Sequence, residues 1–211
     1  MSSYLTLASR HDLTAEIEVK RSRFLAVVRR VDDEGAARAL VAELRKQHHD
    51  ARHHCSAFVL GPTPSIERSN DDGEPAGTAG SPMLDVLRGR ELSDVAAVVV
   101  RWFGGTLLGA GGLVRAYGDA VAAAVDGARL VRRTELSLFD LAVSHADAGK
   151  VEADLRAHGV AVRGVDYLDR AVLHLAGSLS ELDAQVAEIT SGTGRLVPAG
   201  TTWVDLEASA G

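Results

Sequence analysis

Two stretches decide the fold of this chain: Asp71-Asp-Gly-Glu-Pro-Ala-Gly-Thr-Ala-Gly80 and Val95-Ala-Ala-Val-Val-Val-Arg-Trp-Phe-Gly-Gly-Thr-Leu-Leu-Gly-Ala-Gly-Gly-Leu-Val-Arg-Ala-Tyr-Gly118. The apolar run 95–100 is typical of a central strand that is covered on both faces. A helical pattern with Leu113 and Tyr117 on one face follows the glycine-rich segment. Together they predict one unit made of an acidic loop, a strand, a glycine loop and a helix.

The segments before this unit predict further strands and helices. Strand patterns cover residues 14–20, 22–31 and 55–60. A helix with one apolar face is expected to begin after Asp32 or Asp33, either of which can cap it. Ser81 is expected to cap a short helix over residues 83–87, because Pro82 suits the first helical position.

The last third of the chain has a different pattern. After a linker expected over 127–136, it shows a strand over 137–143, a helix over 147–158, strands over 160–167 and 171–175, a helix from Ser178 or Ser180, and a strand over 201–206. The order βαββαβ is that of the ferredoxin-like unit. The sequence therefore predicts an α+β protein of two domains, residues 1–132 and 133–211, with a boundary near Arg132.

Composition restricts the class of protein. Of 211 residues, 46% are apolar and 25% charged, which is ordinary for a soluble globular protein. No apolar run reaches the roughly 18 residues of a membrane helix, and no signal peptide is visible, so we expect a cytoplasmic protein without a membrane partner. The net charge of −6 means that only a local basic patch could attract nucleic acid.

The glycine loop (residues 104–112) has two readings. A strand, a glycine-rich turn and a helix start together suit an anion, because free amides and the helix dipole favour negative charge. Arg101 and Arg115 could add charged hydrogen bonds. The loop lacks both the Walker A ending and the Rossmann spacing. The alternative is a tight turn packed against another part of the protein.

The acidic loop (residues 71–80) also has two readings. Asp71, Asp72 and Glu74 could hold Mg²⁺ together with waters, or one of them could pair with Arg101 or Arg115 and join the two loops. We favour the pairing, because turn-forming residues surround the carboxylates.

A histidine cluster and one cysteine complete the candidates. The cluster comprises His48, His49, His53 and His54, followed by Cys55. Neighbouring residues of a strand point to opposite faces, so His54 and Cys55 are not expected to share a metal. Cys55 is expected to be a small core residue, and its being the single cysteine excludes an internal disulfide. We therefore expect no metal, no cofactor and no catalytic residue. The residues expected to bind an anion or nucleic acid, or to pair the loops, are Asp71, Asp72, Gly73, Glu74, Arg101, Phe103, Gly104, Gly105, Gly109, Gly111, Gly112, Arg115 and Tyr117.

These stretches closely resemble the YigZ/IMPACT family, as do Arg21-Ser-Arg-Phe-Leu-Ala26 and His53-His-Cys55. The resemblance covers roughly residues 14–126, and the βαββαβ tail is similar to the second domain of the bacterial YigZ branch. Three departures are Trp102 where Tyr is common, Ser56 where an aromatic residue is common, and Asp119 where Gly is common. Asp119 adds a negative charge beside the glycine loop, which weakens the phosphate reading.

The resemblance implies a first domain like the second domain of a small-subunit ribosomal protein, a fold also found in small-molecule kinases. It implies a second domain like the last domain of elongation factor G. Eukaryotic members regulate translation initiation by binding a large activator of a starvation-responsive kinase. This suggests a non-enzymatic regulator of translation that acts through RNA, the ribosome or a protein partner. The alternatives are an enzyme or sensor for a phosphorylated small molecule, and a purely architectural role for both loops.

Overall fold

The computed structural model describes residues 2–63 and 65–207 and divides into two compact units. The first unit comprises Ser2–Arg133 together with residues 205–207, and the second comprises Thr134–Val204. Both units mix helices and strands, which confirms the α+β class. No helix in the described ranges is long and apolar enough to cross a membrane.

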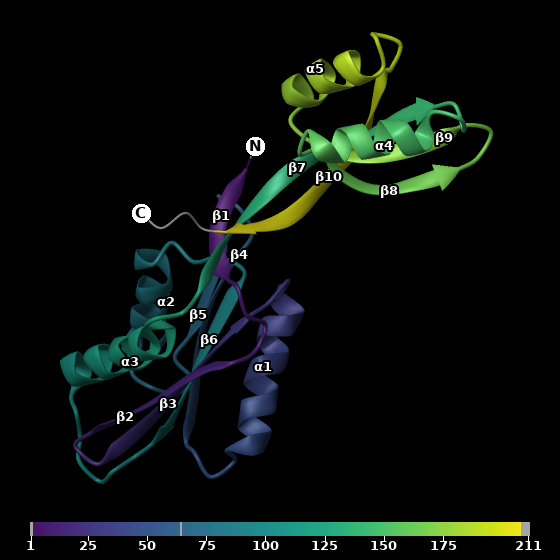
Figure 1. Ribbon diagram of the computed structural model, residues 1–211. Coiled ribbons are helices and arrows are strands. Elements are labelled where there is room, and N and C mark those ends of the chain that lie inside the picture. The colour runs from purple at the N-terminus through teal and green to yellow at the C-terminus, as the bar shows by residue number, and fades with distance from the viewer. Residues whose placement is uncertain (1, 64, 208–211) are drawn as a thin grey trace. The chain divides into compact units, whose positions relative to one another are not determined.

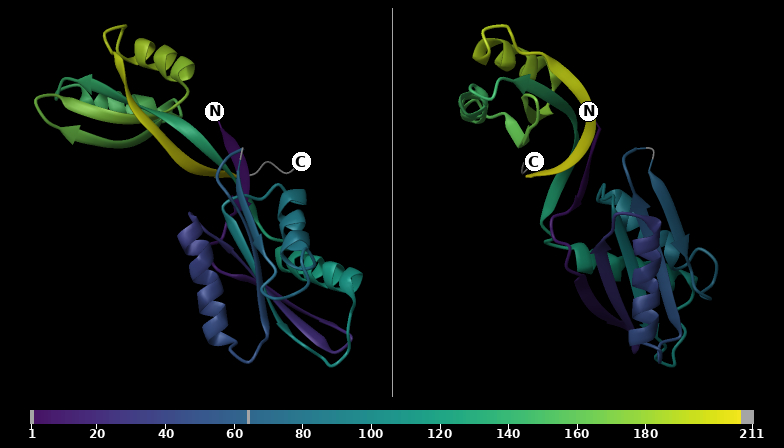
Figure 2. Two further views of the ribbon diagram at one scale, coloured as in Figure 1. Left: turned by 180° about the vertical axis from the view of Figure 1, so that it is seen from behind. Right: turned by 90° about the vertical axis from the view of Figure 1, so that its right-hand side faces the viewer.

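The first unit is built on an antiparallel sheet in the order β2-β3-β6-β4-β5. Its strands are β2 (Leu13–Val19), β3 (Ser22–Arg30), β4 (His53–Leu60), β5 (Ile66–Asn70) and β6 (Val95–Trp102). Helix α1 (Glu34–Gln47) lies on one face, and α2 (Gly80–Gly89) and α3 (Ala110–Val125) lie on the other (Figure 1; Figure 2 shows the same layers from behind).

The central strand β6 explains why its sequence does not alternate. Val95, Ala97 and Val99 pack into the core under α2 and α3. Val98 and Val100 pack into the core under α1. Because both faces are covered, every position from 95 to 100 is buried, as the apolar run predicted. The N-cap of α1 is also confirmed, since the Asp33 side chain accepts from the Ala36 amide at 2.7 Å.

The second unit has the ferredoxin-like order of elements. These are β7 (Leu130–Val143), α4 (Ala148–Ala157), β8 (Ala161–Tyr167), β9 (Ala171–Gly177), α5 (Leu179–Ile189) and β10 (Leu196–Glu207). Strand β9 lies between β7 and β8, antiparallel to both, and β10 pairs with β7. Leu141, Leu155, Leu173 and Leu175 are buried in its core. Ser178 caps α5 by accepting from the Glu181 amide.

Two local expectations were wrong, and two strands were not predicted. The segment 127–136 is not a linker, because Leu130 begins the long strand β7, whose pairing comes from strands distant in sequence. Ser81 does not cap α2: the N-cap position is Ala79, whose side chain cannot accept a hydrogen bond. The strands β1 (Ser3–Leu7) and β5 were not predicted. β5 is a short, exposed edge strand, so its sequence lacks an apolar pattern.

Candidate functional site

A buried ion pair joins the acidic loop to the central strand. Arg101, near the end of β6, donates from Nη1 to Glu74 Oε1 at 2.6 Å, and the two side chains are only 6% and 4% exposed. The Tyr117 hydroxyl, on α3, donates to the same carboxylate oxygen at 2.7 Å. The loop is thus fixed to both the strand and the helix. Of the two arginines that could pair with a carboxylate, it is Arg101 that does so; Arg115 lies exposed on α3 and forms no ion pair in the described ranges.

The network continues to the single cysteine. Cys55 Sγ lies 3.3 Å from the Tyr117 hydroxyl and 3.0 Å from the Asp71 carbonyl oxygen. Burial, and then the neighbouring Cys55 and Glu74, raise the pKa of Tyr117 far above its ordinary value. Burial raises the pKa of the Cys55 thiol to about 12. Both groups therefore stay protonated near neutral pH and act as hydrogen-bond donors.

Native Cys55 is expected to resist alkylation, because the thiolate is the nucleophile. A rise in pKa from 9.0 to about 12 lowers the thiolate fraction at mildly alkaline pH by about a thousandfold. Mass spectrometry after iodoacetamide treatment, with and without denaturant, measures this. Labelling of the native protein as fast as of the denatured protein would contradict the buried network.

The two aspartates of the acidic loop are also engaged by the protein. The Asp71 carboxylate accepts from the amides of Gly77, Ala79 and Gly80 at 2.8–3.0 Å, so it caps α2 from outside the helix. Although burial raises its pKa, these three bonds outweigh that effect and lower the pKa overall. Asp72 accepts from the His54 amide at 2.6 Å and pairs with Arg45. These contacts favour the structural reading of the loop over a Mg²⁺ site.

His53 also contacts the acidic loop. His53 Nδ1 lies 2.8 Å from the Asp72 carbonyl oxygen, which can only accept, so this nitrogen carries the proton. Gly73, with φ of 84°, lies beside the His53 ring. In the described part of the chain, no group of three or more His, Cys, Asp or Glu side chains is placed to hold a metal.

The glycine loop is packed against the turn between β2 and β3. A Cβ added to Gly104 would lie 2.0 Å from the backbone carbon of Arg21, so the two backbones touch. The Gly104 amide donates to Ser22 Oγ at 3.1 Å. Gly105 and Gly109 have φ of 84° and 75°, and Gly111 and Gly112 lie in the first turn of α3. Close approach to the protein itself therefore accounts for Gly104.

Aromatic rings surround the Arg101 guanidinium. Its central carbon lies 5.3 Å from the centre of the Phe24 ring and 5.7 Å from that of Phe103. Phe24 is buried and meets Tyr117 edge-to-face at 5.2 Å, whereas Phe103 is 45% exposed. Phe24 and Arg45 were not among the predicted site residues. Phe24 lies directly opposite Arg101 in the strand register, which the sequence of one strand does not reveal.

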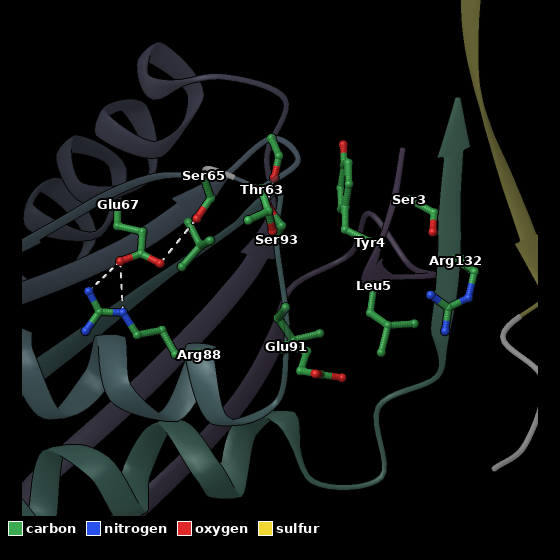
Figure 3. A pocket seen from close by; sticks show the side chains of 13 residues that line it. Ser3, Tyr4, Leu5, Thr63, Ser65, Glu67, Arg88, Glu91, Ser93 and Arg132 are labelled. Atoms are coloured by element: carbon green, nitrogen blue, oxygen red, sulfur yellow. Dashed lines mark hydrogen bonds and ion pairs between the residues drawn. The ribbon is translucent and has the colours of Figure 1, made fainter. Parts of the chain in front are cut away.

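A separate cavity of about 350 Å³ contains none of the predicted site residues (Figure 3). Across one side of it, Arg88 Nε donates to Glu67 Oε2 at 2.8 Å, and Ser65 donates to the same carboxylate group at 3.2 Å. These charges satisfy one another on that side of the cavity.

Family comparisons agree with the two units. A family model for the Impact N-terminal domain matches residues 20–125, and one for a domain of unknown function, DUF1949, matches residues 141–193. The IMPACT family member YvyE of Bacillus subtilis is 38% identical over 197 residues, which cover 91% of this chain and 89% of that protein. The IMPACT family member YigZ of Escherichia coli is 38% identical over 202 residues, covering 93% and 98%.

Solved structures resemble the chain to different extents. A crystal structure described as that of a hypothetical protein is 38% identical, covers 94% of this chain and 98% of its own, and superposes with a TM-score of 0.66. The structure of the two-domain translational regulator Yih1 is 27% identical and covers 56% of this chain and 46% of its own. Its TM-score is 0.35, which is too low to carry a structural argument.

Proposed function

The chain belongs to the IMPACT family, and we propose that it is a non-enzymatic, cytosolic regulator of translation that binds RNA, the ribosome or a protein of the translation machinery at the glycine-loop surface. One observation carries the proposal. The carboxylates of the acidic loop and the charge of Arg101 are engaged inside the protein, whereas Arg115 and Phe103 remain exposed beside the glycine loop. Because the buried groups are engaged in holding the loops in place and Arg115 and Phe103 are exposed, this surface suits binding of a partner better than catalysis.

Arg115→Glu is expected to weaken salt-sensitive co-sedimentation with ribosomes by about tenfold or more, because it reverses a charge on the proposed surface. Arg38→Glu is the matched control, since Arg38 is exposed on α1, on the other face of the sheet. Both variants should keep the stability of the parent protein within about 0.5 kcal/mol. Absence of ribosome and RNA binding by the parent protein at low salt would contradict the proposal.

A phosphorylated small molecule at the glycine loop is the second candidate. One observation favours it: Gly109, which precedes the first residue of α3 as its N-cap, has no side chain, and no side-chain cap satisfies the free amides there. A thermal-shift screen with nucleotides and Mg²⁺ tests this candidate. A ligand at a hundredfold excess over its Kd stabilises by about 2.7 kcal/mol, so a flat screen counts against it.

A further inference from the structure

The turn between β2 and β3 is strained and carries two cations. Val19 and Ser22 are paired in the sheet, so Lys20 and Arg21 alone make the turn. Both have positive φ, 47° and 66°, a conformation that hairpin turns normally give to Asn and Gly. Each such residue costs about 1 kcal/mol or more, and such strain is most often kept where it serves a function.

The glycine loop holds this turn in place. The turn and the loop after β6 lie side by side (Figure 1, lower left), and because Gly104 touches the backbone of Arg21, we treat the two as one surface. We call it the hairpin–loop surface. Its residues are Lys20, Arg21, Phe103, Leu107, Val114 and Arg115.

The surface exposes large apolar side chains. Phe103 is 45% exposed, Leu107 is 83% exposed and Val114 is 41% exposed. They lie within a stretch of twelve residues that runs through the loop into the first turns of α3. Clustered apolar side chains rimmed by charge mark interaction sites more often than single exposed ones do.

The charge of the surface is positive, although the chain as a whole carries −6. Lys20, Arg21 and Arg115 form no ion pair among residues 2–63 and 65–207, and all three are exposed. The acidic residues of β2 lie on the opposite face of the sheet, where Glu16 pairs with Arg23. Asp119, one turn further along α3 than Arg115, is the nearest acidic residue on that helix.

We infer that the hairpin–loop surface binds an acidic amphipathic segment of a partner protein; this inference rests on the proposed function and narrows its partner to a protein. Carboxylates of the segment meet Lys20, Arg21 and Arg115, and its apolar side chains cover Phe103, Leu107 and Val114. Charge complementarity selects an acidic partner. Single-stranded RNA fits less well, because the surface offers one exposed aromatic ring for stacking, and exposed Leu and Val give bases no stacking platform.

Fluorescence anisotropy with the full chain tests the inference. The probe is a labelled amphipathic peptide of about four helical turns, with Leu on one face and Glu on the other. Its controls are the same peptide with Leu replaced by Ser, the same peptide with Glu replaced by Lys, and a labelled oligouridine. We expect the acidic peptide to bind at least about tenfold more tightly than either control peptide and than the RNA.

Variants of the chain locate the binding. Leu107→Ser and Lys20→Glu are each expected to weaken binding of the acidic peptide by about tenfold. Leu179→Ser, at a position 56% exposed in the second unit, and Arg38→Glu are the matched controls and should have no effect. Equal binding by Leu107→Ser and the parent protein, or no binding of the acidic peptide, would overturn the inference. Tighter binding of oligouridine that is lost in Lys20→Glu would also overturn it while leaving the proposed function standing, and the ribosome assay tests that function separately.

Discussion

Glu74→Ala is expected to destabilise the first unit by about 3–5 kcal/mol. The substitution leaves the Arg101 guanidinium, 6% exposed, without its counter-charge, and removing one partner of a buried ion pair costs about this much. It also leaves the Tyr117 hydroxyl without its acceptor at 2.7 Å. Urea denaturation measures the loss, and hydrogen exchange of the β6 amides assigns it to this unit.

A double variant separates the effect of losing the buried charges from the effect of losing side-chain volume. Glu74→Leu combined with Arg101→Met removes both charges and keeps comparable volume, so stability should return to within about 1–2 kcal/mol of the parent protein. Glu74→Gln alone should remain strongly destabilised, because its amide can accept from Tyr117 but does not neutralise Arg101. If Glu74→Ala were no more destabilising than a surface substitution, about 0.5 kcal/mol, the buried pair would not be what holds the acidic loop.

Gly104→Ala is the second change with a large expected effect, about 3 kcal/mol or more. The new Cβ would lie 2.0 Å and 2.1 Å from the carbon and oxygen of the Arg21 carbonyl, and 2.4 Å from the Ser22 nitrogen. These are backbone atoms, so the β2–β3 turn or the glycine loop has to move. The same displacement should weaken binding at the hairpin–loop surface. Thermal denaturation measures the first effect, and the peptide titration measures the second.

Neighbouring glycines supply the controls. Gly111 lies in α3 with no atom close to an added Cβ, so Gly111→Ala should be neutral or stabilise by up to about 1 kcal/mol. Gly105 also has open space but a φ of 84°, so Gly105→Ala should cost about 1 kcal/mol from backbone strain alone. An effect of Gly104→Ala no larger than that of Gly105→Ala would contradict the close packing of loop and turn.

Local patterns predicted most of the architecture. The run 95–100 predicted a strand covered on both faces, and Asp33 and Ser178 predicted helix starts, because each signal lies within a few residues of its effect. The first half of strand β7 was missed because it carries Arg132 and Arg133 near the boundary between the units, and because its pairing comes from distant strands. The start of α2 was misplaced because its amides are capped by Asp71, nine residues before Gly80.

The candidate site was less predictable, because its contacts join residues that are distant in sequence. The sequence suggested that a carboxylate pairs with an arginine, but only the register of β3 and β6 and the position of α3 select Glu74, Arg101 and Tyr117. The close approach of Gly104 to Arg21 joins residues more than eighty positions apart. The strained Lys20–Arg21 turn gave no signal, because neither residue type favours positive φ.

The buried charges of Glu74 and Arg101 hold the acidic loop to β6, and we propose that the exposed side chains around the glycine loop bind the partner. Ribosome co-sedimentation of the Glu74→Leu/Arg101→Met double variant, run beside Arg115→Glu at matched stability, tests it most directly. We expect the double variant to bind ribosomes as the parent protein does, and Arg115→Glu to bind them about tenfold or more weakly. Loss of binding by a fully stable double variant, with binding retained by Arg115→Glu, would contradict it.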